Sequence, residues 1–338
     1  MTRIAESVRS VHAAPLPSAR GTISQWVINA LESGDPASAS APDMTGVDAW
    51  SDDAQLALFI CQEMHYRGWR GVDPALEWDP SIITARVALE DVLLAAVDRE
   101  LEPHSTGVSA ANALEGLARD SLRAGGAVER LQGAADGTRF RDYFAARSLY
   151  HLKEADPHAW VIPRLTPASK APFVAVEFDE YGAGRGEDVH QCLYADLLEA
   201  MGMDHGYLDY LDRAAAAAIA PVTLMSAFGL RRAEMGAAVG HFAATEVTSP
   251  PGSARMMAAL ERIGAPEPAT RFYREHVEAD AVHELVMRHD VVGAMVAADP
   301  CNERDIVRGI AAWRLAEDRL DDALLTAWRD GKTLVRDL

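Results

Sequence analysis

Apolar residues at helical spacing run through most of the chain, and this periodicity limits the fold more than any other feature. Ala54, Leu58, Cys61 and Met64 recur three or four residues apart, as on one face of a helix. Similar stretches are expected at residues 83–101, 109–124, 139–155, 189–203, 209–220, 224–248, 252–263, 266–295 and 302–329. Gly or Pro marks most breaks between them. We therefore predict an all-α protein, a single bundle of about eight to ten helices.

Only residues 172–178 resemble a strand, and they run into the glycine-rich segment 181–186. A strand, a glycine turn and a following helix can bind a phosphate group. The glycine spacing here matches neither common phosphate-binding motif, and no alternating series of strands and helices surrounds it. We interpret the segment as a helix with a glycine interruption.

The first 50 residues differ in composition from the rest of the chain. They hold Pro15, Pro17, Pro36 and Pro42 and a tract rich in Ser, Ala and Pro over 33–42, which offers little burial to offset the entropy of ordering. We expect a loosely ordered arm over 1–50, with one short helix at 23–32, and a helical domain over 51–338.

Composition restricts the partners and the compartment. The 338 residues are 49% hydrophobic, and 51 acidic against 32 basic residues give a net charge of −19, which disfavours nucleic acid and anionic membranes. The three cysteines are far apart in the sequence, so neither a disulfide framework nor a cysteine zinc site is expected. No stretch approaches the roughly 20 apolar residues of a membrane span, and the first residues lack the apolar core of a secretion signal. We expect a cytoplasmic protein.

The sharpest local motif lies near residue 280. On a helix, His276, Asp280 and His283 project within a sector of roughly 60°, so two imidazoles and a carboxylate share one face. This face is suited to a metal ion, although an ordinary solvated polar stripe explains a single such match equally well.

Carboxylates and a histidine recur inside apolar patterns elsewhere. Glu246 has small and apolar neighbours, and a buried carboxylate is costly unless it is paired or bound to a cation. Glu154 ends an apolar helix, and Glu180 and His190 bracket the glycine-rich break. Helix bundles build dinuclear iron or manganese sites from such parts. His241 lies five residues before Glu246, which rotates it about 140° away, so we do not expect it at the same site.

The ordered combination of these segments resembles the haem-oxygenase-like diiron oxidases, also called iron-containing redox enzymes. It consists of Glu177-Phe-Asp-Glu-Tyr-Gly-Ala-Gly, then His190-Gln-Cys-Leu-Tyr, then a helix with a glutamate, then the motif near residue 280. The resemblance covers about residues 50–330 and implies a haem-oxygenase-like helical bundle over residues 51–338. Members of the family are all-α, bind two irons rather than haem, and use O2 to hydroxylate nitrogen, cleave C–C bonds or decarboxylate substrates.

Seven metal ligands are implied by this resemblance. They are Glu154, Glu180, His190, Glu246, His276, Asp280 and His283. His276 resembles an additional histidine found in part of the family, notably in its N-oxygenating members, and favours a reaction at nitrogen. Glu177 competes with Glu180, and we prefer Glu180 because it directly precedes Tyr181 and Gly182.

The function implied is that of a non-haem diiron oxygenase. Its cofactors are two Fe ions with O2 as co-substrate, with Mn as an alternative metal, and no catalytic residue is assigned beyond the ligands. We expect a small-molecule substrate, most readily an amine or amino-acid-like compound, and leave open an external electron donor and a homodimer. Two alternatives remain: a non-metal or haem-binding member of the same fold, and a non-catalytic acidic interaction protein.

Overall fold

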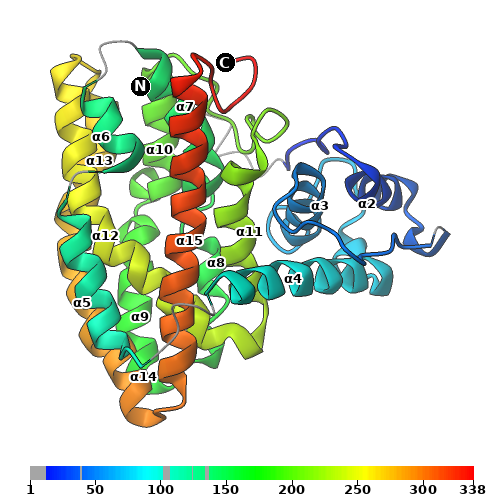
Figure 1. Cartoon of the computed structure of the whole chain (residues 1–338), viewed down its shortest axis with the longest axis horizontal. Coiled ribbons are helices and arrows are strands. Elements are labelled where there is room, and N and C mark those ends of the chain that lie inside the picture. Colours follow the sequence, from blue (N-terminus) through cyan, green and yellow to red (C-terminus); the bar gives the residue numbers. More distant parts are fainter. Residues whose placement is uncertain (1–12, 39, 102–106, 124, 134–136) are drawn as a thin grey trace.

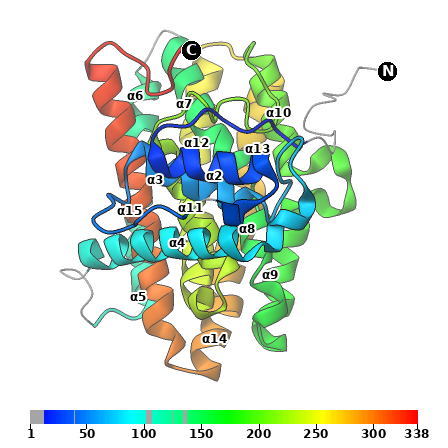
Figure 2. The ribbon, with the colours of Figure 1, turned by 90° about the vertical axis from the view of Figure 1, so that its right-hand side faces the viewer.

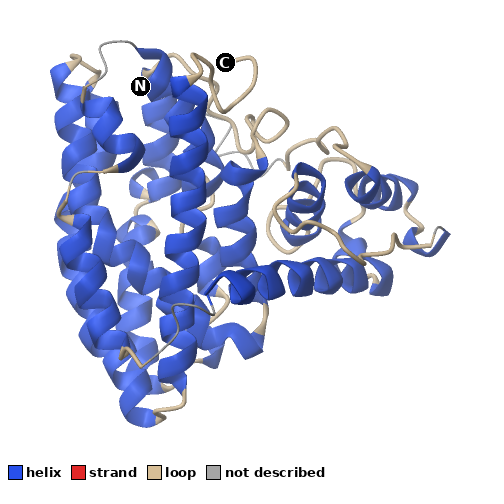
Figure 3. Cartoon of the chain, in the orientation of Figure 1, coloured by secondary structure: helices blue, strands red, loops and turns tan. Residues whose placement is uncertain are grey.

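Helices form the regular structure of the computed structural model, which describes residues 13–38, 40–101, 107–123, 125–133 and 137–338. No strand occurs among these residues (Figure 3), and the extended pairing is an isolated bridge between Ala14 and Trp69. The helices are α2 (Thr22–Ser33), α3 (Asp52–Glu63), α4 (Pro80–Leu101), α5 (Ala110–Ser121), α6 (Gly126–Gln132), α7 (Gly137–His151), α8 (Asp156–Ala159), α9 (Pro167–Glu180), α10 (His190–Ala200), α11 (Ala216–Leu230), α12 (Met235–Arg262), α13 (Glu267–Leu285), α14 (Gly293–Ala298) and α15 (Asn302–Arg329). The prediction of an all-α protein is confirmed.

The long helices form a bundle around α12, with a smaller lobe at one side. Helix α12 packs along both α13 and α15, and α10 packs on α13. Helices α2, α3 and α4 form the lobe that projects from the bundle in Figure 1 and faces the viewer in Figure 2. None of the described helices is both long enough and apolar enough to cross a membrane.

Two glycines allow α12 and α15 to cross at backbone contact. A Cβ atom on Gly240 would lie 2.0 Å from the carbonyl oxygen of Ile306, and one on Gly309 would lie 2.0 Å from that of Ala237. Because any larger residue would push the helices apart, these positions fix how α12 sits against the C-terminal helix. Glu246, further along α12, is thereby placed in the bundle interior.

Helix α2 of the N-terminal arm is packed, whereas most of the described residues over 32–48 are exposed, so the loosely ordered arm stays a prediction outside α2. The predicted short helix is present as α2, and Ile23, Val27, Ile28 and Leu31 are buried as it packs on α3. Each such side chain contributes about 1.5–3 kcal/mol when fully buried, which offsets the ordering entropy that the composition suggested would prevail. Residues 1–12 and 39 lie outside the described residues, and the domain boundary at residue 50 stays a prediction.

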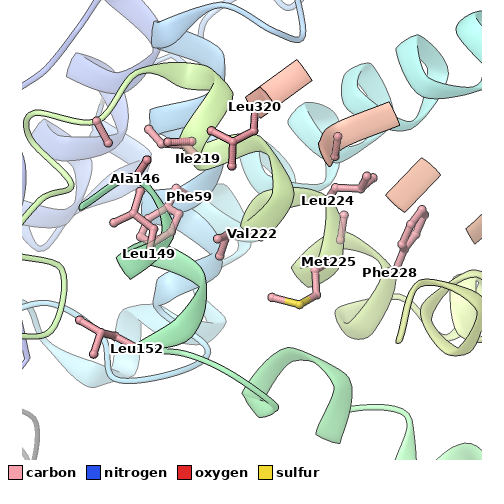
Figure 4. Packing of buried hydrophobic residues seen from close by; sticks show 14 of the residues in the cluster. Phe59, Ala146, Leu149, Leu152, Ile219, Val222, Leu224, Met225, Phe228 and Leu320 are labelled. Atoms are coloured by element: carbon pink, nitrogen blue, oxygen red, sulfur yellow. The ribbon is translucent and has the colours of Figure 1, made fainter. Parts of the chain in front are cut away.

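The lobe shares its core with the bundle. Figure 4 shows Phe59 of α3 beside Leu149 of α7 and Ile219 of α11, with Leu320 of α15 nearby. All four side chains are buried in one continuous apolar cluster. The N-terminal lobe is therefore packed against the helices that lead to the candidate site.

Several predicted helix boundaries are wrong. Helix α11 begins at Ala216 rather than near residue 209, the stretch 224–248 is broken between Leu230 and Met235, and the predicted helix at 252–263 belongs to α12. Helix α11 is buried on nearly all sides, so no apolar stripe marks its ends. Pro250 and Pro251 lie inside α12, where each removes one backbone hydrogen bond without ending the helix. Residues 172–178 are helical, as the glycine-interrupted interpretation requires.

Candidate metal centre

Acidic and histidine side chains from five segments of the chain meet inside the bundle. One cluster contains Glu154, His190 and His276, and the other contains Glu180, Glu246, Asp280 and His283. Within each cluster, one ligand-type atom from every residue lies within 4.8 Å of the others. All seven residues are buried. The structure therefore brings together the full set of residues that the sequence singled out.

The tight return from α9 to α10 places Glu180 against His190. Glu180 is the last residue of α9, and His190 is the first of α10. Gly182 has φ +76°, and a Cβ atom there would lie 2.6 Å from the backbone nitrogen of Val189. Glycine is thus required on both conformational and steric grounds. As a result, His190 Nδ1 lies 2.8 Å from Glu180 Oε2 and joins the two clusters.

Helix α13 presents its three residues on one face, as its spacing predicts. It is followed directly by the π-helical segment Val286–Val292, a rare form that is frequent at functional sites. On the neighbouring helix α12, Pro250 lies four residues after Glu246, so the Glu246 carbonyl has no helical N–H partner. Irregular backbone therefore occurs next to the site on both helices.

In the first cluster, the ring of His276 is held by its own helix. Its Nδ1 lies 2.7 Å from the carbonyl oxygen of Phe272, so Nδ1 carries the proton and donates it to that oxygen. Nε2 then faces the cluster and lies 3.5 Å from Glu154 Oε2. The other oxygen of Glu154 lies 3.1 Å from Nδ1 of His151, which supports the carboxylate from outside the cluster. A backbone or side-chain acceptor on the outer nitrogen is the usual arrangement for a metal-binding histidine.

In the second cluster, His283 lies among three carboxylates. Its Nδ1 lies 3.2 Å from Glu246 Oε2, 3.3 Å from Asp280 Oδ1 and 3.5 Å from Glu180 Oε1. Its Nε2 lies 3.1 Å from Asp179 Oδ2 on the outer side. Asp179 is not among the predicted site residues, although it directly precedes Glu180 in the sequence. Asp179 fixes the orientation of the His283 ring.

Four atoms in these clusters are buried without a hydrogen-bond partner among the described residues. They are Glu154 Oε2, His190 Nδ1, His276 Nε2 and Asp280 Oδ1. Each of these atoms lies 2.8–3.5 Å from another charged group of the site but without hydrogen-bond geometry, whereas buried polar atoms are almost always hydrogen-bonded. Carboxylate oxygens and imidazole nitrogens are donors that suit iron and manganese. The residues present therefore fit two divalent metal ions.

The electrostatics of the site favour positive charge. Among the described residues, the ion pairs of its four carboxylates are with histidines alone. Burial raises the pKa of Glu246 well above its usual value, and the charge of Asp280 adds to this. Burial acts to lower the pKa of His276 and His283, but neighbouring carboxylates outweigh it and raise these pKa values to about 10 and about 11. Without a metal, the carboxylates thus draw protons onto the imidazoles.

Glu177 and His241 lie outside both clusters. Glu177 is buried, and neither of its oxygens has a hydrogen-bond partner among the described residues. Burial, together with the charge of Glu180, raises its pKa well above the usual value. His241 Nδ1 instead lies 3.3 Å from Nε2 of His158. Of the two glutamates, Glu180 is the one that belongs to a cluster, and its role as a ligand stays a prediction.

A cavity of about 410 Å³ reaches the first cluster. Glu154 and His276 line it, together with Tyr150 and Tyr273. The hydroxyl of Tyr273 is buried and has no hydrogen-bond partner among the described residues. An ion pair between Arg147 and Glu317 also lines the cavity. The cavity has the size of a small-molecule site.

Comparison with known proteins gives one family. Residues 141–318, more than half of the chain, match the family model described as iron-containing redox enzyme. This range contains all seven residues of the two clusters. No curated protein matches the chain.

Proposed function

The chain belongs to the iron-containing redox enzymes, and from this premise we propose that it is a non-haem diiron oxygenase that uses O2 to oxidise a small organic substrate. The reaction we favour is N-oxygenation of an amine or amino-acid-like substrate. C–C cleavage and decarboxylation are the other reactions to be distinguished from it by the mass of the product.

One observation carries the proposal: two adjoining clusters of buried carboxylates and imidazoles, in which four of the ligand-type atoms lack a hydrogen bond. In the proposed site, Glu154, His190 and His276 hold one iron, and Glu180, Glu246, Asp280 and His283 hold the other. The distance of 2.8 Å between His190 and Glu180 supports two adjacent ions rather than two separate sites.

The residues around the clusters indicate what the metal and the protein would each contribute. Bound iron would supply O2 activation and electron transfer. Phe272 and Asp179 hold the outer nitrogens of His276 and His283, so each ring keeps its other nitrogen directed inward. The cavity would hold the substrate beside Glu154 and His276, and the Tyr273 hydroxyl would bind a polar group of it. His276, which favours a reaction at nitrogen, lines this cavity.

Metal analysis of the protein loaded with Fe(II) without oxygen tests the proposal. We expect two irons per chain in the wild type and loss of iron and of O2 consumption in Asp280→Ala. Glu278→Ala is the matched control, because Glu278 lies on the same helix but is exposed, and it should retain both irons. Less than one bound iron per chain in the wild type would contradict the proposal.

A second comparison separates the competing glutamates of α9. Glu180→Gln should lose one iron, whereas Glu177→Gln should retain both, since only Glu180 belongs to a cluster. The haem-binding alternative requires a Soret band after haem is added. The four buried carboxylates have no role in that alternative.

Substrate class is tested by O2 consumption from the diferrous protein. The panel contains amino acids, guanidines and fatty acids, and products are identified by mass. Addition of one oxygen atom to an amine supports N-oxygenation, whereas a shortened or decarboxylated product points to chemistry at carbon. Turnover of fatty acids alone would refute the assignment to nitrogen.

A further inference from the structure

A buried ion pair joins the N-terminal lobe to the turn that follows α7. The ammonium group of Lys153 contacts the carboxylate of Glu63, and their side chains are 1% and 0% exposed. The hydroxyl of Tyr207 donates to the same carboxylate at 3.0 Å, and the backbone N–H of Arg67 donates to it at 3.2 Å. On the other side, Lys153 Nζ lies 3.8 Å from the ring centre of Tyr66. The two charges are therefore held in a fixed geometry.

A second connection leads from the same lobe to the backbone of Glu154. The guanidinium of Arg67 donates to Gln191 Oε1 at 2.9 Å, and the amide nitrogen of Gln191 donates to the Glu154 carbonyl at 3.1 Å. The next residue, Ala155, has φ +71°. For a residue with a Cβ atom, such a conformation costs roughly 1–2 kcal/mol and persists only when its surroundings hold it. The turn is thus constrained from the lobe at two points.

Stability alone does not account for this ion pair. Burying two charges costs as much as their attraction returns, and a well-packed apolar pair is often as stable. What the pair does instead is fix the position of the backbone next to Glu154, because Lys153 directly precedes Glu154 and both follow the end of α7. Anchoring Lys153 to Glu63 fixes the turn from which the Glu154 carboxylate reaches to within 3.5 Å of His276.

We propose that Glu63, Lys153 and Arg67 are positioning residues for Glu154, so that the N-terminal lobe completes the first cluster. Glu63 and Arg67 lie before residues 141–318, which match the family model. The inference that Glu154 is positioned for a metal rests on the proposed function. The inference that the lobe holds the turn does not.

Hydrogen exchange in the metal-free protein tests the turn directly. The double variant Glu63→Leu/Lys153→Met replaces the ion pair with an apolar pair, so that neither Glu63 nor Lys153 is left as a buried charge without its partner. We expect backbone amides of the turn over residues 152–156 to exchange at least about tenfold faster, while those of 276–283 keep their wild-type rates. Tyr207→Phe, a milder change that removes one hydrogen bond to Glu63, should have a smaller effect on the same amides. Unchanged exchange in both variants would overturn the inference.

Fe(II) titration without oxygen then tests the link to the metal. Loss of a group that orients a ligand typically lowers metal affinity 10–100-fold. We expect the double variant to bind one ion with wild-type affinity and the other at least about tenfold more weakly. Two ions bound with wild-type affinities would refute a role in the first cluster. If the wild type itself binds less than one iron, the proposed function fails, and the exchange measurement still decides whether the lobe holds the turn.

Glu90→Gln is the matched control. Glu90 is a fully buried carboxylate of the same lobe, paired with Arg86 and Arg231 rather than with the turn. This variant should lose stability but keep both irons and the exchange rates of residues 152–156. Weakening of one iron site in Glu90→Gln as well would show that any damage to the lobe suffices, and would overturn the specific role of the Glu63 and Lys153 pair.

Discussion

The buried pair His158 and His241 should make the protein sensitive to acid. His241 is 3% exposed, and its Nδ1 lies 3.3 Å from Nε2 of His158. Burial lowers the pKa of His241 from 6.5 to about 4, and burial with the neighbouring imidazole lowers that of His158 well below its usual value. Both rings are therefore neutral in the folded protein at pH values where the same histidines are already protonated in the unfolded chain.

The sign and size of the effect follow from linkage. When folding lowers the pKa of a base, the folded protein keeps its full stability above the pKa of the unfolded state. Stability is then lost as the pH falls toward the pKa of the folded state. For His241, the two pKa values predict a loss of about 2 kcal/mol between about pH 7.5 and about pH 5. For a chain of this length, that equals a fall of about 3 °C in Tm.

The assay is denaturant unfolding of metal-free wild type and His241→Gln at both pH values. Other groups titrate in both proteins, so the difference between their pH dependences isolates His241. We expect the variant to lose about 2 kcal/mol less than the wild type on acidification. Equal losses in the two proteins would refute the argument that His241 is held neutral by burial.

Three further changes test other parts of the fold and the site. Gly309→Ala should lower the free energy of unfolding by about 2 kcal/mol or more, because the added Cβ would lie 2.0 Å from the Ala237 carbonyl oxygen and overpacking outweighs the gain in helix propensity. A denaturation midpoint at or above the wild-type value would contradict the close crossing of α12 and α15. Asp142→Asn should lower the free energy of unfolding by about 1–3 kcal/mol and speed proteolysis of the C-terminal tail, since Asp142 accepts hydrogen bonds from the Trp328 indole and from the tail backbone. An unchanged rate of tail cleavage would count against this prediction. Glu177→Gln should make the metal-free protein more stable than wild type at neutral pH but not near pH 4, because an acid whose pKa is raised by burial destabilises the fold as the pH rises. The measurement is denaturant unfolding at both pH values, and the same difference in stability between variant and wild type at each pH would refute it.

Much of the fold and the site could be predicted because both depend on local spacing. The face formed by His276, Asp280 and His283 follows from helix geometry alone. The return from Glu180 to His190 depends on the glycine at position 182, which was visible in the sequence as a break. Tertiary packing then brings these local features together in the two clusters.

The parts that could not be predicted depend on contacts between distant segments. The pairing of Glu63 with Lys153 spans 90 residues, and no local pattern indicates it. The short helix α2 was predicted, but its packing on α3 was not, because composition does not reveal which distant segment covers its apolar face. The boundaries of α11 were missed because a helix buried all round has no periodicity to locate its ends.

Charge balance gives an independent reason to prefer two divalent ions over one. Four of the acidic residues behind the net charge of −19 are directed into the site rather than to the surface. A single divalent ion would leave two buried negative charges, which cost several kcal/mol unless protons neutralise them. The raised pKa values of His276 and His283 indicate that protons do so in the metal-free protein, but a protonated imidazole cannot bind a metal. Two divalent ions balance the four carboxylates and leave all three imidazoles neutral, the state in which each of the seven side chains can act as a ligand.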